Sequence, residues 1–337
     1  MLKRVLMLSI LVVAPAVPTS AAPERPALHF KIFARTGIRL TDVVWTGTQF
    51  LYVENTTNAI SAAGPAGTPV RPFAALPHMS EETRCVASTG GHGFPVRTIY
   101  CHTPDNKIYR LSSDGKSVSV FATLPDHSQS DGALAFDTVG AFGHRLLVTA
   151  GVGGGRAALY ALDCRNGRRT VAARIPAVEG GMVVAPPGFG RFGGRLIAPD
   201  ELHGRLIAVD ARGRAVVLAR SGLPAGGDIG VESLGFVPPG FERCMTALLA
   251  DRAVAGAPHP GTDSILGVAG AALRTAGVQA GDLLAATEGG GETIAVRCGR
   301  RACIVRLVAH GPAVTHAEGH IVFAPGTSSS RRGRLAG

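Results

Sequence analysis

Two stretches of the chain share one pattern, and this pattern decides the predicted fold. The first is Asp131-Gly-Ala-Leu-Ala-Phe-Asp-Thr-Val-Gly-Ala-Phe-Gly-His-Arg-Leu-Leu-Val-Thr149, and the second is Glu179-Gly-Gly-Met-Val-Val-Ala-Pro-Pro-Gly-Phe-Gly-Arg-Phe-Gly-Gly-Arg-Leu-Ile-Ala198. Each begins with an acidic residue, continues through an apolar run and a Gly/Phe-rich turn, and ends in a second apolar run. Third apolar runs follow at 158–162 and 205–209, before turn sequences and a fourth run. Each unit therefore predicts four short strands.

The same unit recurs along most of the chain. Its starts are Asp42, Glu82, Asp131, Glu179, Glu232 and Glu318, which lie 40, 49, 48, 53 and 86 residues apart. Four short strands in about 45 residues are typical of a β-propeller blade. A blade buries both faces of its sheet only when it packs between two neighbours. We therefore predict an all-β fold, a six-bladed β-propeller of four-stranded antiparallel blades over residues 28–326.

The last two units depart from this period. The unit that starts at Glu232 carries a long insertion in the fifth blade, with a short helix expected over 269–278. Strand-like runs between 282 and 308 leave a seventh blade as an alternative. The unit that starts at Glu318 runs out of chain, and the N-terminal run 29–35 is expected to complete it and close the ring. A β-sandwich, or two smaller β domains, is the other alternative.

The N-terminus has the order of a secretory signal peptide over residues 1–21. Lys3 and Arg4 precede an apolar run, and small residues follow it. The run is too short and too interrupted by proline for a stable membrane span, although an uncleaved anchor remains the alternative. We therefore expect a secreted, periplasmic or otherwise extracytoplasmic protein, with a flexible basic tail at 327–337.

Composition limits the possible partners. The chain is 46% hydrophobic and 17% charged, which fits a large folded core and excludes a disordered chain. The net charge is +10, but no dense basic patch is interleaved with aromatic residues, so no nucleic-acid binding is expected. A small-molecule ligand or an extracytoplasmic protein is the expected partner, and a monomer is the expected state.

All six cysteines lie beyond the predicted signal peptide, where disulfides can form. Cys298 and Cys303 bracket a four-residue turn between two strand-like runs, and Cys85 and Cys101 lie on successive strand-like runs. Both pairs are predicted to form disulfides. Whether Cys164 and Cys244 pair is left open, and no cysteine spacing is typical of a zinc site.

The six acidic starts predict a shared site. Each stands three residues before an apolar or small residue of a first strand: Trp45, Cys85, Leu134, Met182, Gly235 and Ile321. First strands line the channel of a propeller, so the acids should face one another. Crowded carboxylates repel unless some are protonated or a cation binds. We therefore predict a divalent cation, Ca²⁺ first and Mg²⁺ second, on three or four of these acids. The alternative is a solvated channel lining.

The units resemble the six-bladed propellers of the SMP-30/gluconolactonase/strictosidine-synthase-like group and the related NHL-type and TolB-like propellers. The resemblance rests on Asp42-Val-Val-Trp-Thr-Gly-Thr-Gln-Phe-Leu-Tyr-Val-Glu-Asn55, Asp131-Gly-Ala-Leu-Ala-Phe-Asp137 and Glu179-Gly-Gly-Met182. In the lactonases Asp, Asn or Glu at this position binds one divalent cation, which substrate oxygen coordinates. The resemblance implies the first residues of these three stretches as ligands. This chain departs from the lactonases by having acids throughout.

Three functions remain open at this stage. The first is a cation-containing module that binds a ligand or a protein. The second is a metal-dependent hydrolase of a small lactone or ester, in which the ion polarises the carbonyl and a carboxylate or histidine acts as base. The third is another enzyme class, such as a sugar oxidoreductase or a lyase. His78, His127 and His316 each lie shortly before a unit start and are expected at the channel mouth.

Overall fold

The computed structural model describes residues 27–80, 82–125 and 132–326. The predicted signal peptide and tail, together with Asp131 and His127, lie outside the described residues. The described chain is all-β, as expected. Its helical elements are short: η1 (Gly190–Phe192), η2 (Glu201–His203), α1 (Phe241–Cys244) and α2 (Gly270–Thr275). No helix in this part of the chain is long and apolar enough to cross a membrane.

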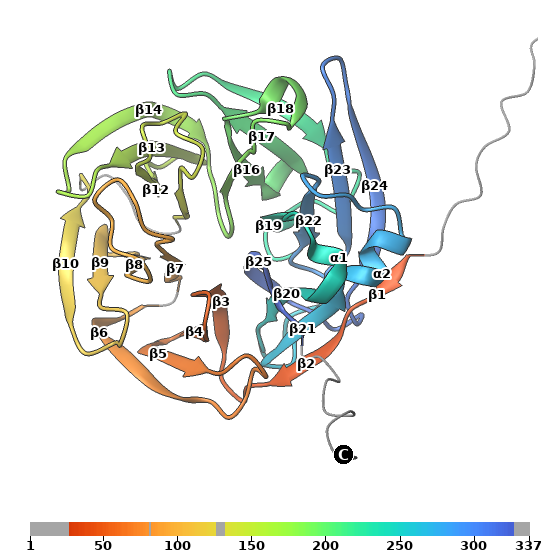
Figure 1. Cartoon of the computed structure of the whole chain (residues 1–337), viewed down its shortest axis with the longest axis horizontal. Coiled ribbons are helices and arrows are strands. Elements are labelled where there is room, and N and C mark those ends of the chain that lie inside the picture. Colours follow the sequence, from red (N-terminus) through yellow and green to blue (C-terminus); the bar gives the residue numbers. More distant parts are fainter. Residues whose placement is uncertain (1–26, 81, 126–131, 327–337) are drawn as a thin grey trace, which may run out of the picture.

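Four separate four-stranded antiparallel sheets follow one another along the chain, and Figure 1 shows them around a common centre. The first holds β3 (Leu40–Trp45), β4 (Phe50–Glu54), β5 (Thr57–Ala63) and β6 (Arg71–Ser80). The second holds β7 (Arg84–Ala87), β8 (Ile99–Thr103), β9 (Lys107–Leu111) and β10 (Val118–Thr123). The third holds β11 (Leu134–Phe136), β12 (Leu146–Gly151), β13 (Arg156–Leu162) and β14 (Arg168–Pro176). The fourth holds β15 (Val183–Val184), β16 (Leu196–Asp200), β17 (Arg205–Val209) and β18 (Ala215–Arg220).

The remaining strands form one nine-stranded sheet in the order β1-β24-β23-β22-β19-β25-β20-β21-β2. Its members are β1 (Leu28–His29), β2 (Lys31–Arg35), β19 (Val231–Phe236), β20 (Met245–Asp251), β21 (Ser264–Ala269), β22 (Leu283–Thr287), β23 (Thr293–Cys298), β24 (Cys303–His310) and β25 (Ala317–Pro325). The strand pairing between its two halves is confined to Leu234 of β19 and His320 of β25, which pair in parallel. The structure is thus propeller-like, with four separate blades and this larger sheet.

The expected insertion in the fifth blade is wrong in its placement. β20 and β21 lie between β19 and β22 in sequence, yet they pair on the far side of β25. The C-terminal strand would otherwise have an unpaired buried edge, and unpaired backbone groups are costly in a core. Residues 245–269 therefore supply the partners that the last unit lacks, and β2 adds to β21 at the outer edge. The expected helix in this region is α2.

The core lies between adjacent sheets. Val44 and Leu51 of the first sheet, for example, pack in one buried cluster with Cys85, Ile99 and Tyr109 of the second. Because each sheet is covered on both faces, the second strand of each separate blade is buried along nearly its whole length rather than at alternate residues. In the middle strand β12 the four residues from Leu146 to Thr149 are completely buried. The first strands of the four blades, β3, β7, β11 and β15, line the central channel together with β19 and β25 of the nine-stranded sheet.

Both predicted disulfides are confirmed. Cys85 and Cys101 are directly opposite on β7 and β8, and Cys298 and Cys303 are opposite on β23 and β24. Cys164 is half-buried, Cys244 is exposed, and neither forms a disulfide. Two disulfides indicate an oxidising, extracytoplasmic environment.

The two disulfides should differ in their contribution to stability. The Cys85–Cys101 bridge spans 16 residues and the Cys298–Cys303 bridge spans 5. Since a longer closed loop restricts the unfolded chain more, the Cys85→Ala/Cys101→Ala variant should lose about 3 kcal/mol of unfolding free energy, and Cys298→Ala/Cys303→Ala about 2 kcal/mol. Urea denaturation under oxidising conditions measures both losses. A reversed order would contradict the loop-length argument.

Candidate functional site

The unit-start acids within the described chain converge at one end of the channel. Asp42, Glu232 and Glu318 are almost completely buried on β3, β19 and β25, and Glu82 directly precedes the Thr83-Arg84 entry into β7. A carboxylate in such a position needs a cation or a proton, because burial disfavours its charged form.

Arg84 is the first cation that the acids contact. Its side chain is 2% exposed, and it forms ion pairs with Glu82 at 2.8 Å, Glu232 at 3.0 Å and Glu318 at 2.9 Å. These carboxylates come from three segments that are distant from one another in the sequence: the entry into β7, β19 and β25. Burial alone would lower the pKa of Arg84, but the surrounding carboxylates raise it well above its usual value. Arg84 is therefore permanently charged.

Arg252, which follows β20, is the second cation. Its Nη1 lies 2.8 Å from Glu82 Oε1, and its Nη2 lies 2.5 Å from Glu318 Oε1 and 3.6 Å from Glu288 Oε1. Glu82 and Glu318 are thus each shared between two guanidinium groups. Shared carboxylates tie β7, β20 and β25 together at the channel mouth.

Asp42 has a separate partner, His320. The His320 Nδ1 lies 3.1 Å from both Asp42 oxygens, and its Nε2 lies 3.2 Å from the Leu134 carbonyl oxygen. Both ring nitrogens therefore face acceptors and donate, so the ring is an imidazolium. Burial opposes this charge, but Asp42 outweighs it and raises the pKa of His320.

In several units the residue after the acid is glycine, because atoms of another unit leave no space there for a side chain. A Cβ on Gly319 would lie 2.4 Å from Asp42 Oδ1, and one on Gly180 would lie 2.3 Å from Glu232 Cγ. Both glycines also have positive φ, at 66° and 73°. The acid-Gly pair of the repeat therefore lets one unit approach the carboxylate of another.

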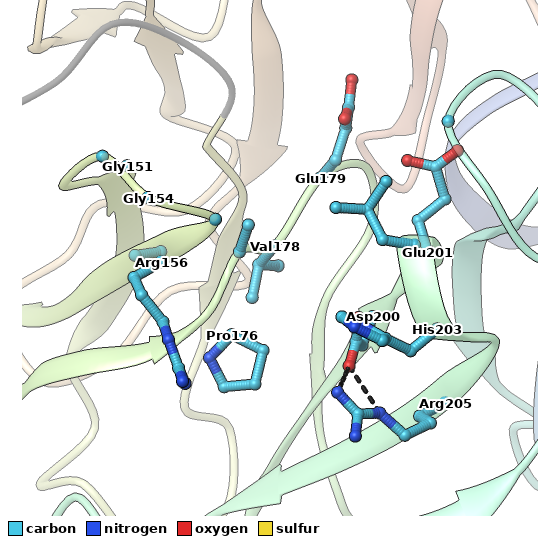
Figure 2. Close-up of a pocket in the computed structure, with 16 residues that line it drawn as sticks. Gly151, Gly154, Arg156, Pro176, Val178, Glu179, Asp200, Glu201, His203 and Arg205 are labelled. Carbon is cyan, nitrogen blue, oxygen red and sulfur yellow. Dashed lines mark hydrogen bonds and ion pairs between the residues drawn. The ribbon is translucent and has the colours of Figure 1, made fainter.

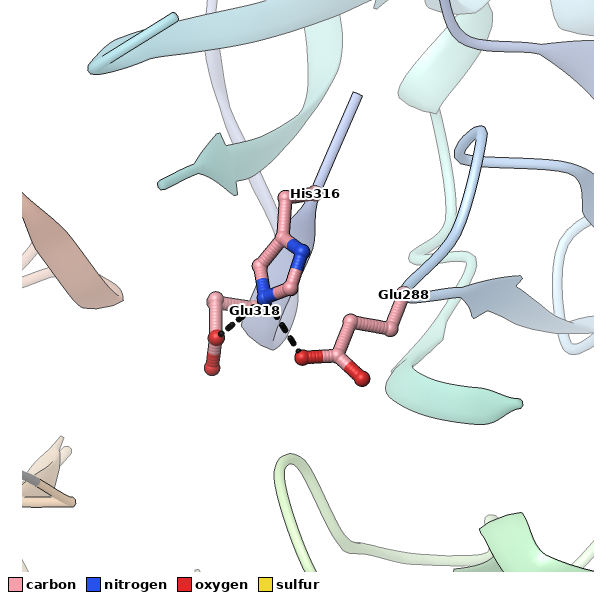
Figure 3. A group of neighbouring side chains, drawn as sticks. All are labelled: Glu288, His316 and Glu318. Carbon is pink, nitrogen blue, oxygen red and sulfur yellow. Dashed lines mark ion pairs between the residues drawn. The ribbon is translucent and has the colours of Figure 1, made fainter. Parts of the chain in front are cut away.

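Glu288, His316 and Glu318 form a compact group whose ligand atoms all lie within 4.8 Å of one another (Figure 3). His316 Nε2 is 2.7 Å from Glu288 Oε1 and 3.5 Å from Glu318 Oε1. Its Nδ1 donates to the His259 carbonyl oxygen at 3.1 Å. Burial would lower the pKa of His316, but the hydrogen bonds to Glu288 and Glu318 raise it to about 9. This ring is also an imidazolium at neutral pH.

Acids outnumber cations at this end of the channel. We call the following described groups the mouth cluster: the carboxyls of Asp42, Glu82, Glu179, Glu201, Glu232, Glu288 and Glu318, and the cations Arg84, Arg252, His316 and His320. Seven carboxyls face four cations. Burial, then neighbouring carboxylates, raise the pKa of Glu232 well above its usual value and that of Glu201 to about 8. These two carboxyls therefore take up a proton more readily than an ordinary glutamate.

A cavity of about 550 Å³ opens beside the mouth cluster (Figure 2). It lies between the β12–β13 and β16–β17 turns, and Glu179 and Glu201 belong to its wall. Arg156 and an Asp200–Arg205 ion pair also line it. This cavity size suits a small ligand, and its wall offers both signs of charge.

The predicted site residues meet in part. Asp42, Glu82, Glu232 and Glu318 share one cluster, Glu179 lies at the cavity, and His316 lies at the mouth as expected. His78, in contrast, is exposed on β6, away from the ion pairs described above.

Sequence reasoning missed Arg84, Arg252, Glu201 and Glu288. One signal was available: Arg84 stands two residues after Glu82, and alternate residues of an extended chain share a face. Arg252 lies in the segment that was interpreted as an insertion. Glu201 and Glu288 follow second strands of their sheets rather than beginning first strands, so the repeat does not mark them.

No family model and no curated protein matches this chain. Solved structures do match. A calcium-binding protein, regucalcin, from Agrobacterium tumefaciens strain C58 is 13% identical, with a TM-score of 0.50 over 87% of this chain and 81% of that chain. Virginiamycin B lyase from Staphylococcus aureus is 12% identical, with a TM-score of 0.48 over 92% and 79%. A putative gluconolactonase is 10% identical, with a TM-score of 0.47 over 83% and 81%. Likeness at this identity shows the fold alone, a β-propeller.

Removing Arg84 should destabilise the protein strongly. Arg84→Met should lower the free energy of unfolding by about 3–5 kcal/mol at pH 7, since it leaves buried carboxylates without their cation. The loss should shrink at pH 5, because those carboxylates would then take up protons on folding and so favour the folded state. Thermal melts at both pH values measure this. Arg212→Met, at an exposed arginine, is the control. An equal loss at both pH values would contradict the proposed charge balance.

Proposed function

We propose that this propeller is exported and binds a small polar molecule at its channel mouth, beside a divalent cation held by Glu288, His316 and Glu318. The observation that carries the proposal is the convergence of these three side chains within 4.8 Å at the charged end of the channel. The neighbouring cavity of about 550 Å³ would hold the molecule.

The residues present fit a cation in two respects. First, the mouth cluster has more carboxyls than cations, and a divalent ion would add the positive charge that these carboxyls lack. Second, Glu232 Oε2 and Glu201 Oε1 are buried with no hydrogen-bond partner among the described residues. A cation would have to displace the Nε2 proton of His316 and the Arg252 guanidinium from Glu318. An ion would therefore compete with Arg252 for Glu318 and with a proton for His316 Nε2.

The donor set bears on which ion would bind. Two carboxylates and one imidazole are fewer oxygens than the six to eight that Ca²⁺ prefers. Arg84 and Arg252 already occupy oxygens of Glu82, Glu232 and Glu318. The imidazole ligand suits Zn²⁺ better than Ca²⁺ or Mg²⁺, and the two carboxylates also suit Mn²⁺. The expected Ca²⁺ therefore gives way, in this proposal, to a smaller ion.

A second candidate is hydrolysis of a small lactone or ester. The observation that favours it is Glu201, a carboxyl in the cavity wall whose pKa of about 8 keeps it protonated at neutral pH. A protonated carboxyl can give its proton to a leaving oxygen. When bound, the ion would polarise the carbonyl and acidify water. Arg156 and Arg205 would bind an anionic group of the substrate.

We also propose that the nine-stranded sheet consists of the fifth and sixth blades of the propeller. Strand pairing between these two blades is confined to Leu234 and His320, with β25-β20-β21-β2 as the last blade. Six first strands around one channel support a count of six blades. Export through the segment 1–21 agrees with the two disulfides, and the chain would act as a monomer.

The test is bound-metal analysis by plasma mass spectrometry, followed by titration of the chelator-treated protein with Mn²⁺, Zn²⁺, Ca²⁺ and Mg²⁺. We expect one ion per chain and a melting temperature that falls on chelation. Glu288→Gln and His316→Ala should each weaken binding by about 10–100-fold, as expected for loss of a ligand or its support.

Two further variants sharpen this test. Arg252→Gln should strengthen ion binding, because it removes the guanidinium that competes for Glu318. Glu292→Gln is the matched control, since Glu292 pairs with His310 at 3.7 Å outside the cluster. If none of the four ions raises the melting temperature, the cation site is wrong, and the mouth cluster is a salt-bridge network only.

A further inference from the structure

The opposite part of the channel has a different chemistry. Below the mouth cluster, the six first strands enclose a cavity of about 300 Å³. In the order of the strands, half-buried apolar side chains face it: Trp45, Val86, Phe136, Val183, Phe236 and Val322. Two of the lining residues are of ionisable types. Cys85 is held in a disulfide, and the charge of His320 is balanced by Asp42. The cavity therefore offers no net charge to a ligand.

The aromatic rings of this lining are held in place from behind. Trp45 packs on Phe50 at 4.7 Å between ring centroids, and Phe136 packs edge-on against Phe94 at 5.1 Å. Phe236 packs edge-on against Phe189 at 4.9 Å. A ligand that contacts these rings would not have to order them, which removes part of the entropic cost of binding.

The cavity is bounded by a polar side chain toward the mouth cluster and adjoins a groove on its other side. His320, the member of the mouth cluster that joins Asp42 to the Leu134 carbonyl, lies in its wall, and the other members lie beyond it. On the other side a groove of about 650 Å³ shares Thr138, Val184 and Phe236 with it. A ligand could therefore enter from the groove and stop beneath His320.

We propose that the lower channel is a second binding site, which takes a small uncharged aromatic or otherwise apolar molecule. Its volume is at the small end of ligand pockets and suits a molecule of about two fused or linked rings. Burying such a molecule against six apolar side chains supplies the driving force, at roughly 25 cal/mol per Å². An ionic ligand would lose its hydration without gaining a partner. The site is independent of the cation and of the proposed function at the mouth.

The chain carries its own reporter for this site, because Trp45 is its single tryptophan. N-phenyl-1-naphthylamine is a neutral aromatic probe whose emission rises in apolar surroundings and which accepts energy from tryptophan. Titrating the chelator-treated full chain should give a saturable rise with one probe per chain. Trp45 emission should fall by at least half at saturation.

Variants separate this cavity from the adjoining groove. Ala135→Leu adds bulk inside the channel and should weaken probe binding at least tenfold, whereas Ala75→Leu, on the exposed side of β6, should change it less than twofold. Val86→Phe narrows the channel at a half-buried position, and it serves if Ala135→Leu does not fold. Ala280→Leu fills only the groove.

Each outcome is decisive. Loss of binding in a folded channel variant, with Trp45 emission no longer quenched, supports the site. The proposal is overturned if the probe does not bind. It is also overturned if Ala280→Leu abolishes binding while the channel variants do not, because the groove alone would then be the site. Restoring metal should leave the result unchanged, so this outcome is distinguishable from failure of the cation site.

Discussion

The arrangement at the channel mouth depends on one buried guanidinium. Arg84 contacts carboxylates from three segments of the chain that lie up to 236 positions apart in the sequence. The repeat brings acids to one level, and their mutual repulsion would otherwise oppose closure of the ring. Arg84 attracts these carboxylates and so holds together the segments that carry them. Arg252 pairs with Glu82 and Glu318 in the same way. Buried charge here stabilises a particular arrangement of blades rather than adding to the apolar core.

Much of the fold could be predicted because a repeated unit gives repeated local evidence. The acid, the apolar run and the Gly/Phe-rich turn mark the same strands in several units, and cross-strand cysteines follow once the strands are placed. The partners of β25 could not be predicted in this way. Residues 245–269 have the sequence of an insertion in the fifth unit. They become neighbours of β25 only in the folded chain, where they cover its otherwise unpaired edge. Long-range pairing leaves no local mark in a single sequence.

The site was predictable to the extent that it follows the repeat. Asp42, Glu232 and Glu318 were expected to converge, and they do. Their neutralising partners do not follow the repeat: Arg84 occurs in one unit, and Arg252 follows a middle strand. Glu288, a further acid of the cluster, follows β22 and is not marked by the repeat either. Crowded carboxylates need positive charge or protons near them, and Arg84 and Arg252 supply positive charge here. The sequence does not distinguish an ion, an arginine or a proton as the source, because all three satisfy the same electrostatic condition.

The presence of β2 and β25 in one sheet, with β20 and β21 between them, imposes an order of events on folding. β20 gains its inner neighbour only when residues 317–325 have been made, so the edge of β20 stays open until synthesis of this region ends. An open edge can pair with another molecule, and closing so long a loop is slow. The newly made chain thus passes through a period in which every early blade is complete but the circle is not.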